Sequence, residues 1–122
     1  MLEIAIKNIL KEITSLEVTP VFGVGKAPYL TYNVTPIDGG VVKQSQVEVK
    51  IIDDDFDNTL EIREKVLKKL DMENKEPSLV NSKIVLRSGL AGGGSLFNDS
   101  IQMWEVSCIF IIRWRDKNGI ER

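Results

Sequence analysis

The segment of residues 102–114 constrains the fold more than any other part of the sequence, because an apolar side chain occupies every second position. Those positions are Trp104, Val106, Cys108, Phe110, Ile112 and Trp114. Alternation with a period of two is typical of a β-strand that buries one face. We therefore expect a strand through the core here, with Trp104, Phe110 and Ile112 buried.

The length of this strand limits its shape. Thirteen extended residues span about 43 Å, whereas a compact chain of 122 residues has a radius of gyration of only about 14 Å. The strand must therefore bend, or one of its ends must overhang the domain. Its second face is apolar only in the middle, so we expect that face to be half covered.

Apolar residues at steps of three and four predict two amphipathic helices, at residues 2–16 and 58–70. Either Asn58 or Asp57 is the expected N-cap of the second helix. The stretch of residues 71–82 is polar, so we expect no element there.

Runs of β-branched and aromatic residues predict four more strands, at residues 18–22, 29–35, 46–51 and 83–87. A glycine-containing turn separates the first two of these strands, so we expect them to pair as a hairpin. The third alternates cleanly, with Val47, Val49 and Ile51 directed inward. The tail of residues 116–122 is polar and is expected to fray.

The expected order is helix, three strands, helix and two strands, without an internal repeat. Turns rather than helices join most of the strands, which favours antiparallel pairing. We predict a single α+β domain over residues 1–122, with a mixed, mainly antiparallel five-stranded sheet and both helices on one face.

The composition argues against several classes of function. The sequence has no histidine and a formal net charge of -2. Histidine-based nucleophile pairs and metal sites are therefore excluded, and the lack of a basic surface argues against direct recognition of nucleic acid. We expect no catalytic residues, no cofactor and no bound metal, and hence no enzyme.

Cys108 is the only cysteine, and its place on the apolar face indicates a buried structural thiol. A reduced, intracellular site of synthesis fits such a residue. The N-terminus shows no basic segment followed by an apolar run, and the longest apolar stretch is residues 108–112. We expect neither a signal peptide nor a membrane span.

The one cluster of hard oxygen ligands is acidic and consists of Asp53, Asp54, Asp55 and Asp57. Neighbouring aspartates on an extended chain point to alternate sides, and the central glycine of a calcium loop is missing, so a cation site is not expected. We predict a solvated strand-to-helix connection whose negative charge complements the helix N-terminus.

Residues 88–100 are rich in glycine and lie between the last two predicted strands. A phosphate cradle is not expected, because neither a lysine nor a helix follows the glycines. We expect a flexible connection in which residues 89–98 are disordered in an isolated subunit and ordered in an assembly. Its apolar side chains suit a partner surface, or else they pack on the domain's own sheet. The candidate interface residues are Leu90, Gly92, Gly93, Gly94, Leu96 and Phe97, together with Trp114. Trp114 lies on the core face like Trp104 and is expected in the core, but its place near the polar tail makes it the better candidate of the two for an exposed contact.

The layout of the whole chain resembles the tail terminator, or tail completion, proteins of long-tailed bacteriophages and prophages. The features that carry the resemblance are the helix of residues 2–16, the segment 18–36 with its Pro-Tyr-Leu-Thr-Tyr, the strand 46–52, the helix 58–70 and the closing strand 104–114. The resemblance implies an α+β subunit that forms a hexameric ring on the end of the tail tube, stops its polymerisation and joins the tail to the head.

The same resemblance implies three kinds of partner: other copies of the chain, the tail tube protein and the head connector proteins. It implies no membrane, and a place in the virion tail after assembly in the host bacterial cytoplasm. Another head-to-tail connector or minor virion component is the nearest alternative. A small intracellular binding module and an enzyme with an aspartate-based metal site are hypotheses from other classes.

Overall fold

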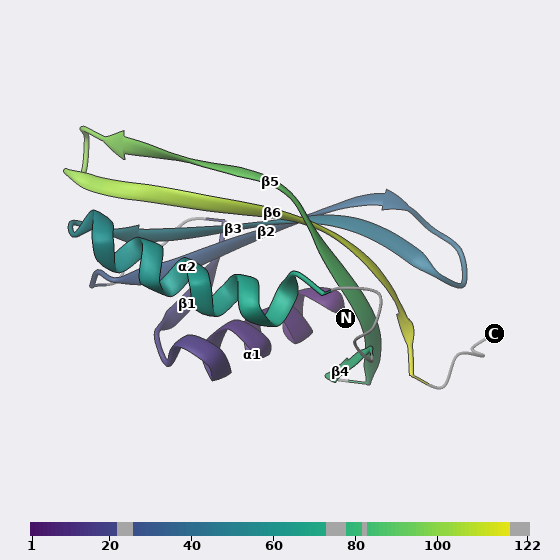
Figure 1. Cartoon of the computed structure of the whole chain (residues 1–122). Coiled ribbons are helices and arrows are strands. Elements are labelled where there is room, and N and C mark those ends of the chain that lie inside the picture. The colour runs from purple at the N-terminus through teal and green to yellow at the C-terminus, as the bar shows by residue number, and fades with distance from the viewer. Residues whose placement is uncertain (22–25, 73–77, 82, 118–122) are drawn as a thin grey trace.

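Two helices lie side by side against one face of a twisted sheet (Figure 1). The computed structural model describes residues 1–21, 26–72, 78–81 and 83–117. Its elements are, in order, α1 (Leu2–Thr14), β1 (Glu17–Pro20), β2 (Tyr29–Asp38), β3 (Lys43–Asp53), α2 (Phe56–Leu70), β4 (Leu79–Asn81), β5 (Ile84–Asn98) and β6 (Met103–Asp116). The predicted α+β class and the placement of both helices on one face are confirmed.

The sheet has the strand order β1-β2-β3-β6-β5-β4. β1 runs parallel to β2, and the other neighbouring pairs are antiparallel. The mixed, mainly antiparallel character is therefore confirmed, but the described residues form six strands instead of the predicted five. The additional strand, β4, lies in the polar stretch 71–82, and its three residues are too few to show a period.

The prediction that residues 18–22 and 29–35 form a hairpin is wrong. Glu17 pairs with Tyr29, and Pro20 pairs with Tyr32, in a parallel register. The connection allows this, because its eight residues can extend for about 26 Å, which exceeds the roughly 13 Å length of β1. The chain can therefore return to the level at which β1 starts before it enters β2.

β6 lies at the centre of the sheet, between β3 and β5. It pairs with β3 from Trp104 to Trp114, and with β5 along its whole length. Figure 1 shows that β6 bends toward its C-terminal end. The strand is therefore accommodated by bending, one of the two outcomes that its predicted length allows.

Alternate side chains of β6 enter the core as predicted, namely Val106, Cys108, Phe110 and Ile112. Trp104 does not, because it is only half-buried at the start of the strand. Its ring packs between Phe56 and Phe97 in a separate aromatic cluster. The prediction that Trp104 belongs to the core is therefore wrong.

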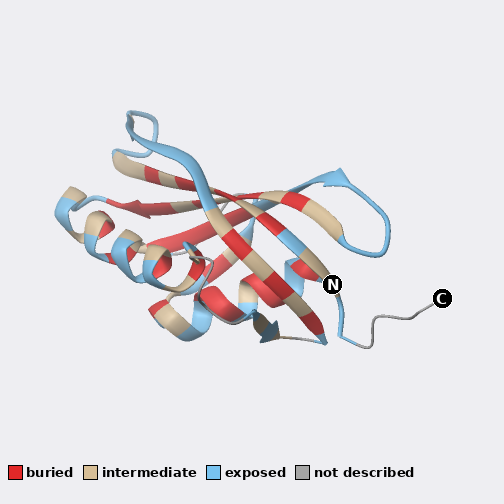
Figure 2. Cartoon of the chain, turned by 45° about the vertical axis from the view of Figure 1, so that its right-hand side comes forward, coloured by how far each residue is buried: buried red, intermediate tan, exposed pale blue. Residues whose placement is uncertain are grey.

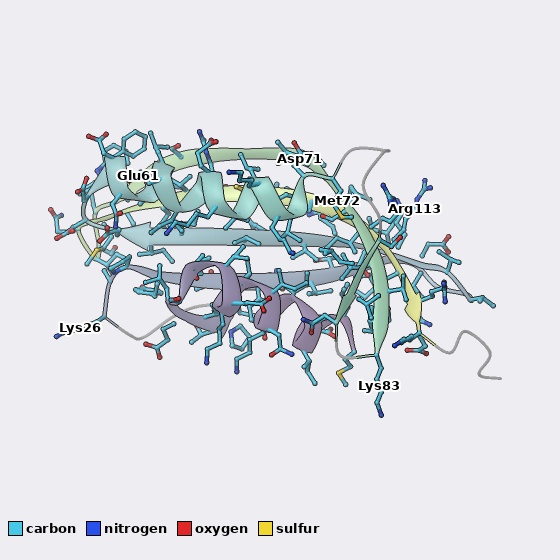
Figure 3. The ribbon with its side chains drawn as sticks, turned by 60° about the horizontal axis from the view of Figure 1, so that its bottom comes forward. Lys26, Glu61, Asp71, Met72, Lys83 and Arg113 are labelled. Carbon is cyan, nitrogen blue, oxygen red and sulfur yellow. The ribbon has the colours of Figure 1, made fainter. Side chains whose placement is uncertain are left out.

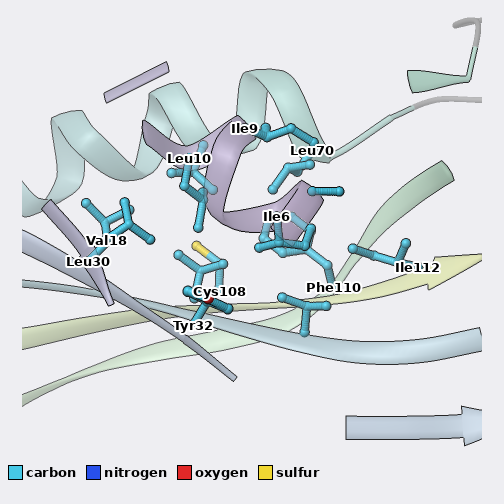
Figure 4. Close-up of a cluster of buried hydrophobic side chains, with 14 of the residues drawn as sticks. Ile6, Ile9, Leu10, Val18, Leu30, Tyr32, Leu70, Cys108, Phe110 and Ile112 are labelled. Atoms are coloured by element: carbon cyan, nitrogen blue, oxygen red, sulfur yellow. The ribbon is translucent and has the colours of Figure 1, made fainter. Parts of the chain in front are cut away.

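Side chains from both helices pack on this face of the sheet and form one apolar core (Figure 4). α1 contributes Leu2, Ala5, Ile6, Ile9 and Leu10, and α2 contributes Ile62, Val66 and Leu70. α1 ends earlier than predicted, because Ser15 adopts a left-handed conformation with φ 58° and donates its backbone N–H to the Lys11 carbonyl at 2.9 Å. In the described ranges, neither helix is both long enough and apolar enough to cross a membrane.

The expectation of a flexible connection at residues 88–100 is wrong. β5 runs through most of that segment and pairs with β6 as far as Asn98, so only residues 99–102 form the turn. The three consecutive glycines hide the strand from pattern analysis, because they carry no side chains that alternate. The hydrogen bonds to β6 offset the conformational entropy that ordered glycines lose.

A β-bulge interrupts β5 at Ala91. Leu90 pairs with Phe110 and Gly92 pairs with Ile109, so Ala91 is left without a partner residue. Because side chains alternate along a strand, the extra residue exchanges the two faces of β5. Even-numbered residues face the helices before the bulge, and odd-numbered residues face them after it.

The start of α2 is capped by Asp55 and not by the predicted Asn58 or Asp57. The Asp55 carboxylate accepts hydrogen bonds from the backbone N–H groups of Asp57 at 3.0 Å and Asn58 at 3.4 Å. Several neighbouring residues here are able to cap a helix, which is why the sequence did not single out Asp55.

The C-terminal end of α2 is tied to β5 through Asp71 and Met72, which Figure 3 labels. The Met72 backbone N–H donates to the Ser88 carbonyl at 3.0 Å, and the Leu90 N–H donates to the Asp71 carboxylate at 3.2 Å. These two bonds cover the outer edge of β5 as far as Leu90.

Candidate assembly surface

The outer edge of β5 is uncovered along its second half. β4 pairs with β5 only from Ile84 to Leu86, and the end of α2 contacts the edge at Ser88 and Leu90. No strand in the described ranges pairs with this edge at residues 91–98. Figure 2 shows most of this half in the colour of exposed residues. An unpaired edge is a template for pairing with another chain.

The glycines leave the backbone of this edge accessible. At Gly92 and Gly94, a Cβ atom would meet nothing within 4 Å. Gly93 differs, because its φ is +158° and a Cβ atom there would collide with the backbone oxygen of Ser107. Packing therefore requires glycine at position 93, whereas a Cβ atom at positions 92 and 94 would have open space around it.

A hollow of about 360 Å³ lies between α2 and this part of β5. It is lined by Arg63, Leu67, Leu90, Gly92, Gly93, Gly94, Ser107 and Cys108. The Nε atom of Arg63 is buried and has no hydrogen-bond partner among the described residues. A buried donor without an acceptor is destabilising. The side chain as a whole is half-buried, so Arg63 places a positive charge in the wall of the hollow.

Cys108 lines the hollow but is only 1% exposed. Burial raises the pKa of its thiol to about 11, while the nearby Arg63 lowers that pKa and Glu64 raises it further. The thiol is therefore protonated at neutral pH and is a poor nucleophile. The prediction of a buried thiol is confirmed.

The tip of the β5–β6 hairpin carries an aromatic cluster. The Trp104 ring lies 4.7 Å from the Phe56 ring and 5.2 Å from the Phe97 ring, measured between centroids. Beside it, the Asn98 amide donates to the Glu105 carboxylate at 2.9 Å. The ring contacts hold the turn end of the β5–β6 hairpin against the start of α2, and they leave Phe97 39% exposed.

The structure brings together only part of the predicted interface. Leu90 and the three consecutive glycines line the hollow, and Phe97 belongs to the aromatic cluster. Leu96 lies between them in the sequence but faces the opposite side of the sheet, because side chains alternate along a strand. It is 55% exposed, so the segment offers apolar area on both faces.

Trp114 does not share a surface with the other predicted residues. It lies near the far end of β6, where its indole N–H donates to the Ser45 hydroxyl at 3.1 Å. The Lys43 ammonium group lies 5.0 Å from the centre of its ring. Trp114 also packs against the edge of the core, so these contacts account for its position.

Sequence reasoning missed two features of the surface. Arg63 has the pattern of an ordinary charged residue on an amphipathic helix, and only the structure shows its Nε buried beside β5. The second is the β2–β3 turn, where Ile37, Val41 and Val42 are 51%, 72% and 55% exposed. The sequence could have indicated this exposed apolar turn, because apolar residues stand on both sides of a Gly-Gly pair.

The acidic run supports the start of α2. Asp53 is buried, and its carboxylate accepts from the Asp54 backbone N–H at 2.9 Å and the Asn58 amide at 2.8 Å. The prediction of a solvated connection is therefore wrong for Asp53, because these hydrogen bonds replace water. Across the part of the chain that is described, no group of three His, Cys, Asp or Glu residues is placed to hold a metal ion.

No protein-family model matches the chain, and no curated protein matches it. Its fold is similar to that of a solved chain from the virion of a native gene transfer agent particle, with a TM-score of 0.59 and 14% sequence identity over 87% of this chain and 84% of that chain. A second solved structure, which carries no functional name, has a TM-score of 0.57 and 16% identity over 93% of this chain and 90% of that chain. At these identities the similarity shows a shared fold.

Proposed function

We propose that the chain is a structural subunit of a phage or phage-derived particle, where it forms a hexameric ring on the end of the tail tube. The observation that carries the proposal is the fold shared with a chain of a gene transfer agent virion over most of both chains. The uncovered edge of β5 supports it, because each subunit of a closed ring needs surfaces for its neighbours.

A structural role in place of a catalytic one is part of the proposal. The sequence has no histidine, and the raised pKa of Cys108 keeps its thiol protonated. Arg63 is the one charged residue in the described lining of the hollow, and an arginine side chain is suited to binding an acceptor group. These features favour a surface that binds other proteins.

In this role the ring ends polymerisation of the tube and presents a surface to the head connector proteins. Its partners are other copies of the chain, the tail tube protein and the connector. The subunit is assembled in the host bacterial cytoplasm and ends in the virion tail, without contact with a membrane or sequence-specific contact with nucleic acid.

Ring formation in solution is expected to depend on concentration. The partly exposed aliphatic side chains of this surface each contribute at most about 1.5–3 kcal/mol on burial, whereas association costs about 4–15 kcal/mol in lost freedom. A tube end holds several subunits close together and so raises their effective concentration. We expect weak rings in free solution and stable rings on tubes.

Electron microscopy of the purified protein, alone and mixed with tail tubes from particles that lack it, tests the proposal. The expected images show closed rings at high protein concentration and one ring at a single end of each tube. A protein that stays monomeric at every concentration and leaves tube ends bare would overturn the proposal. Rings that bind connectors but not tubes would favour the alternative of another head-to-tail joining component.

A matched pair of variants links the images to the β5 surface. Leu96 and Val80 are both 55% exposed, but Val80 lies on β4, away from the second half of β5. Leu96→Asp is expected to lower the fraction of ringed tubes, whereas Val80→Asp leaves that fraction unchanged. Equal effects from both variants would show that Leu96 is not part of the ring contact.

A further inference from the structure

The β2–β3 turn forms a second exposed apolar surface, and we call residues 37–42 the hairpin tip. Ile37, Val41 and Val42 are at least half exposed, and Val41 is the most exposed large hydrophobic residue in the described ranges. Figure 1 shows this hairpin extending beyond both helices. Ile37 and Asp38 also line a hollow with Leu2 and Glu3 at the start of α1. Clustered apolar side chains that are at least half exposed are typical of a contact with another protein.

The hairpin tip and the hollow cannot meet within one subunit. Lys43, directly after the tip, pairs with Trp114, whereas Val49 pairs with Cys108 in the wall of the hollow. The six-residue interval along β3 corresponds to about 20 Å. The hairpin also points away from α2 (Figure 1). Any contact between tip and hollow therefore joins two copies of the chain.

The two surfaces are complementary in charge as well as in apolar character. No hydrogen bond or ion pair involves the Asp38 carboxylate at the tip among the described residues, and the half-buried Arg63 lines the hollow. A carboxylate and a guanidinium form charge-assisted hydrogen bonds. Leu67 and Leu90 line the hollow with Arg63, and the exposed aliphatic residues of the tip lie beside Asp38.

The shape of the hollow favours a protein segment over a small anion. Leu90 and the three glycines that line it belong to the strand edge that is unpaired from residue 91 onward. A segment that enters the hollow therefore also meets free backbone groups, which a hairpin is able to match with its own N–H and C=O groups. A small anion would match only the donors of this lining, because it brings no donor for the free C=O groups.

We propose that the hollow between α2 and β5 receives the hairpin tip of a second copy of this chain, with the neighbour's Asp38 facing Arg63. The inference rests on the proposed ring and names the contact that holds it together. Tip and hollow are different surfaces, so the contact is heterologous. Each subunit gives one tip and receives one, which is the pattern that closes into a ring when the rotation allows it.

Cross-linking between added cysteines tests the contact. One variant carries Val41→Cys at the tip and a second carries Leu90→Cys at the hollow, while the native Cys108 is buried. With a short bis-maleimide reagent at ring-forming concentration, we expect a cross-linked dimer when the two variants are mixed. Neither variant alone is expected to give it. Ile4→Cys, at a position that is 50% exposed on α1, replaces Leu90→Cys as the matched control and is expected to give no product.

A charge exchange tests the pairing of Asp38 with Arg63. Asp38→Lys alters an exposed side chain of the tip and is expected to weaken ring formation by about tenfold or more, measured by sedimentation. Adding Arg63→Glu to the same chain reverses the pair and is expected to restore most of the loss. If Arg63→Glu unfolds the chain, Arg63→Lys on its own serves instead, because it keeps the charge but removes the planar guanidinium. It is expected to weaken ring formation less than Asp38→Lys does, and an Asp38→Lys effect that is the same with Arg63 replaced by Ala would overturn the pairing.

The outcomes separate this inference from the proposed ring. Two results would overturn the tip-in-hollow contact and leave the ring intact, provided that the wild-type chain forms rings. One is that the mixed cysteine variants give no cross-link between positions 41 and 90, and the other is that each variant alone gives as much cross-linked dimer as the mixture. A failure of the second charge exchange to rescue the first, in folded protein, would overturn the Asp38–Arg63 pairing. A wild-type chain that remains monomeric on tubes and in solution would overturn the proposed ring, and the contact with it.

Discussion

The two halves of β5 pair with the same strand but are held in different ways. In the first half, Ile84, Leu86 and Ser88 are buried and alternate with half-buried residues. In the second half, residues 90–97 are all exposed, and the bulge at Ala91 separates the two halves. Both nevertheless pair with β6, and the register shifts by one residue at the bulge.

The difference shows that one strand serves the core and the surface in turn. Side-chain burial holds the first half in place. Backbone hydrogen bonds to β6 and the contact of Phe97 with Trp104 hold the second half. Substitutions in the first half are therefore expected to change the stability of the subunit, and those in the second half to change its assembly.

The largest effect is expected at Phe110, which is fully buried and pairs with Leu90 where the two halves meet. Phe110→Ala should lower the free energy of unfolding by about 3–5 kcal/mol, because it removes apolar contacts and leaves a cavity. Urea denaturation measures the change. A loss below about 1 kcal/mol would show that this face of β6 is not the core face.

A direct comparison of the halves uses two leucines of the same strand. Leu86 is 1% exposed and Leu96 is 55% exposed. Leu86→Ala should lower the free energy of unfolding by about 2–5 kcal/mol, whereas Leu96→Ala should change it by no more than about 0.5 kcal/mol. Similar losses at both positions would mean that burial does not distinguish the halves.

Cys108 reports whether the second half of β5 keeps water away from β6, because it pairs with Gly93. The pKa of its thiol is raised by burial to about 11 from 9.0, so the folded chain holds a proton that the unfolded chain loses. Stability from this group is complete below pH 9 and is lost as the pH rises toward 11, by about 1.4 kcal/mol per unit.

Urea denaturation across this pH range, with Cys108→Val as the control, measures the effect. The valine variant should lose the part of the pH dependence that comes from one thiol. An unchanged slope would show that water reaches the thiol through the second half of β5.

Smaller effects than at Phe110 and Leu86 are expected at the glycines. Gly93→Ala should lower the free energy of unfolding by about 1–3 kcal/mol, because the new Cβ atom collides with the Ser107 carbonyl. Gly94→Ala has open space and should be neutral or stabilising by about 0.4–1 kcal/mol, since it restricts the unfolded chain. Thermal denaturation of both variants separates a glycine that the packing requires from one that leaves the edge open.

The parts of the fold that the sequence predicts are those with a long apolar period. The stripes of α1 and α2 and the middle of β6 bury expected residues, whereas Trp104 at the start of β6 is only half-buried. Both helices lie on the expected face. The parallel pairing of β1 with β2 was not predictable in this way, because pairing direction depends on the path of the connection. The start of β5 was predicted as the strand 83–87, but its continuation to Asn98 was missed because glycines carry no side chains that alternate.

The candidate surface was predictable in position but not in shape. Leu90 and the glycines proved to line a hollow, but its other wall is Arg63, which lies far away in the sequence. Trp114 was grouped with them only because an aromatic side chain near a strand end suggests a contact. Its hydrogen bond to Ser45 requires the pairing of β3 with β6, which no local pattern shows.

The bulge at Ala91 leaves β5 with a competing alignment. If Ala91 entered the ladder, every later residue would slip by one position, and Leu96 would meet Trp104 in place of Phe97. The three consecutive glycines cannot oppose this slippage, because they have no side chains to misplace. The contacts that select the observed alignment lie at the turn end of the β5–β6 hairpin. There Phe97 packs on Trp104 and the Asn98 amide donates a hydrogen bond to Glu105. Phe97 and Asn98 therefore fix the register of the second half of β5. If their contacts with Trp104 and Glu105 are lost, nothing in the glycine stretch itself prevents its two faces from being exchanged.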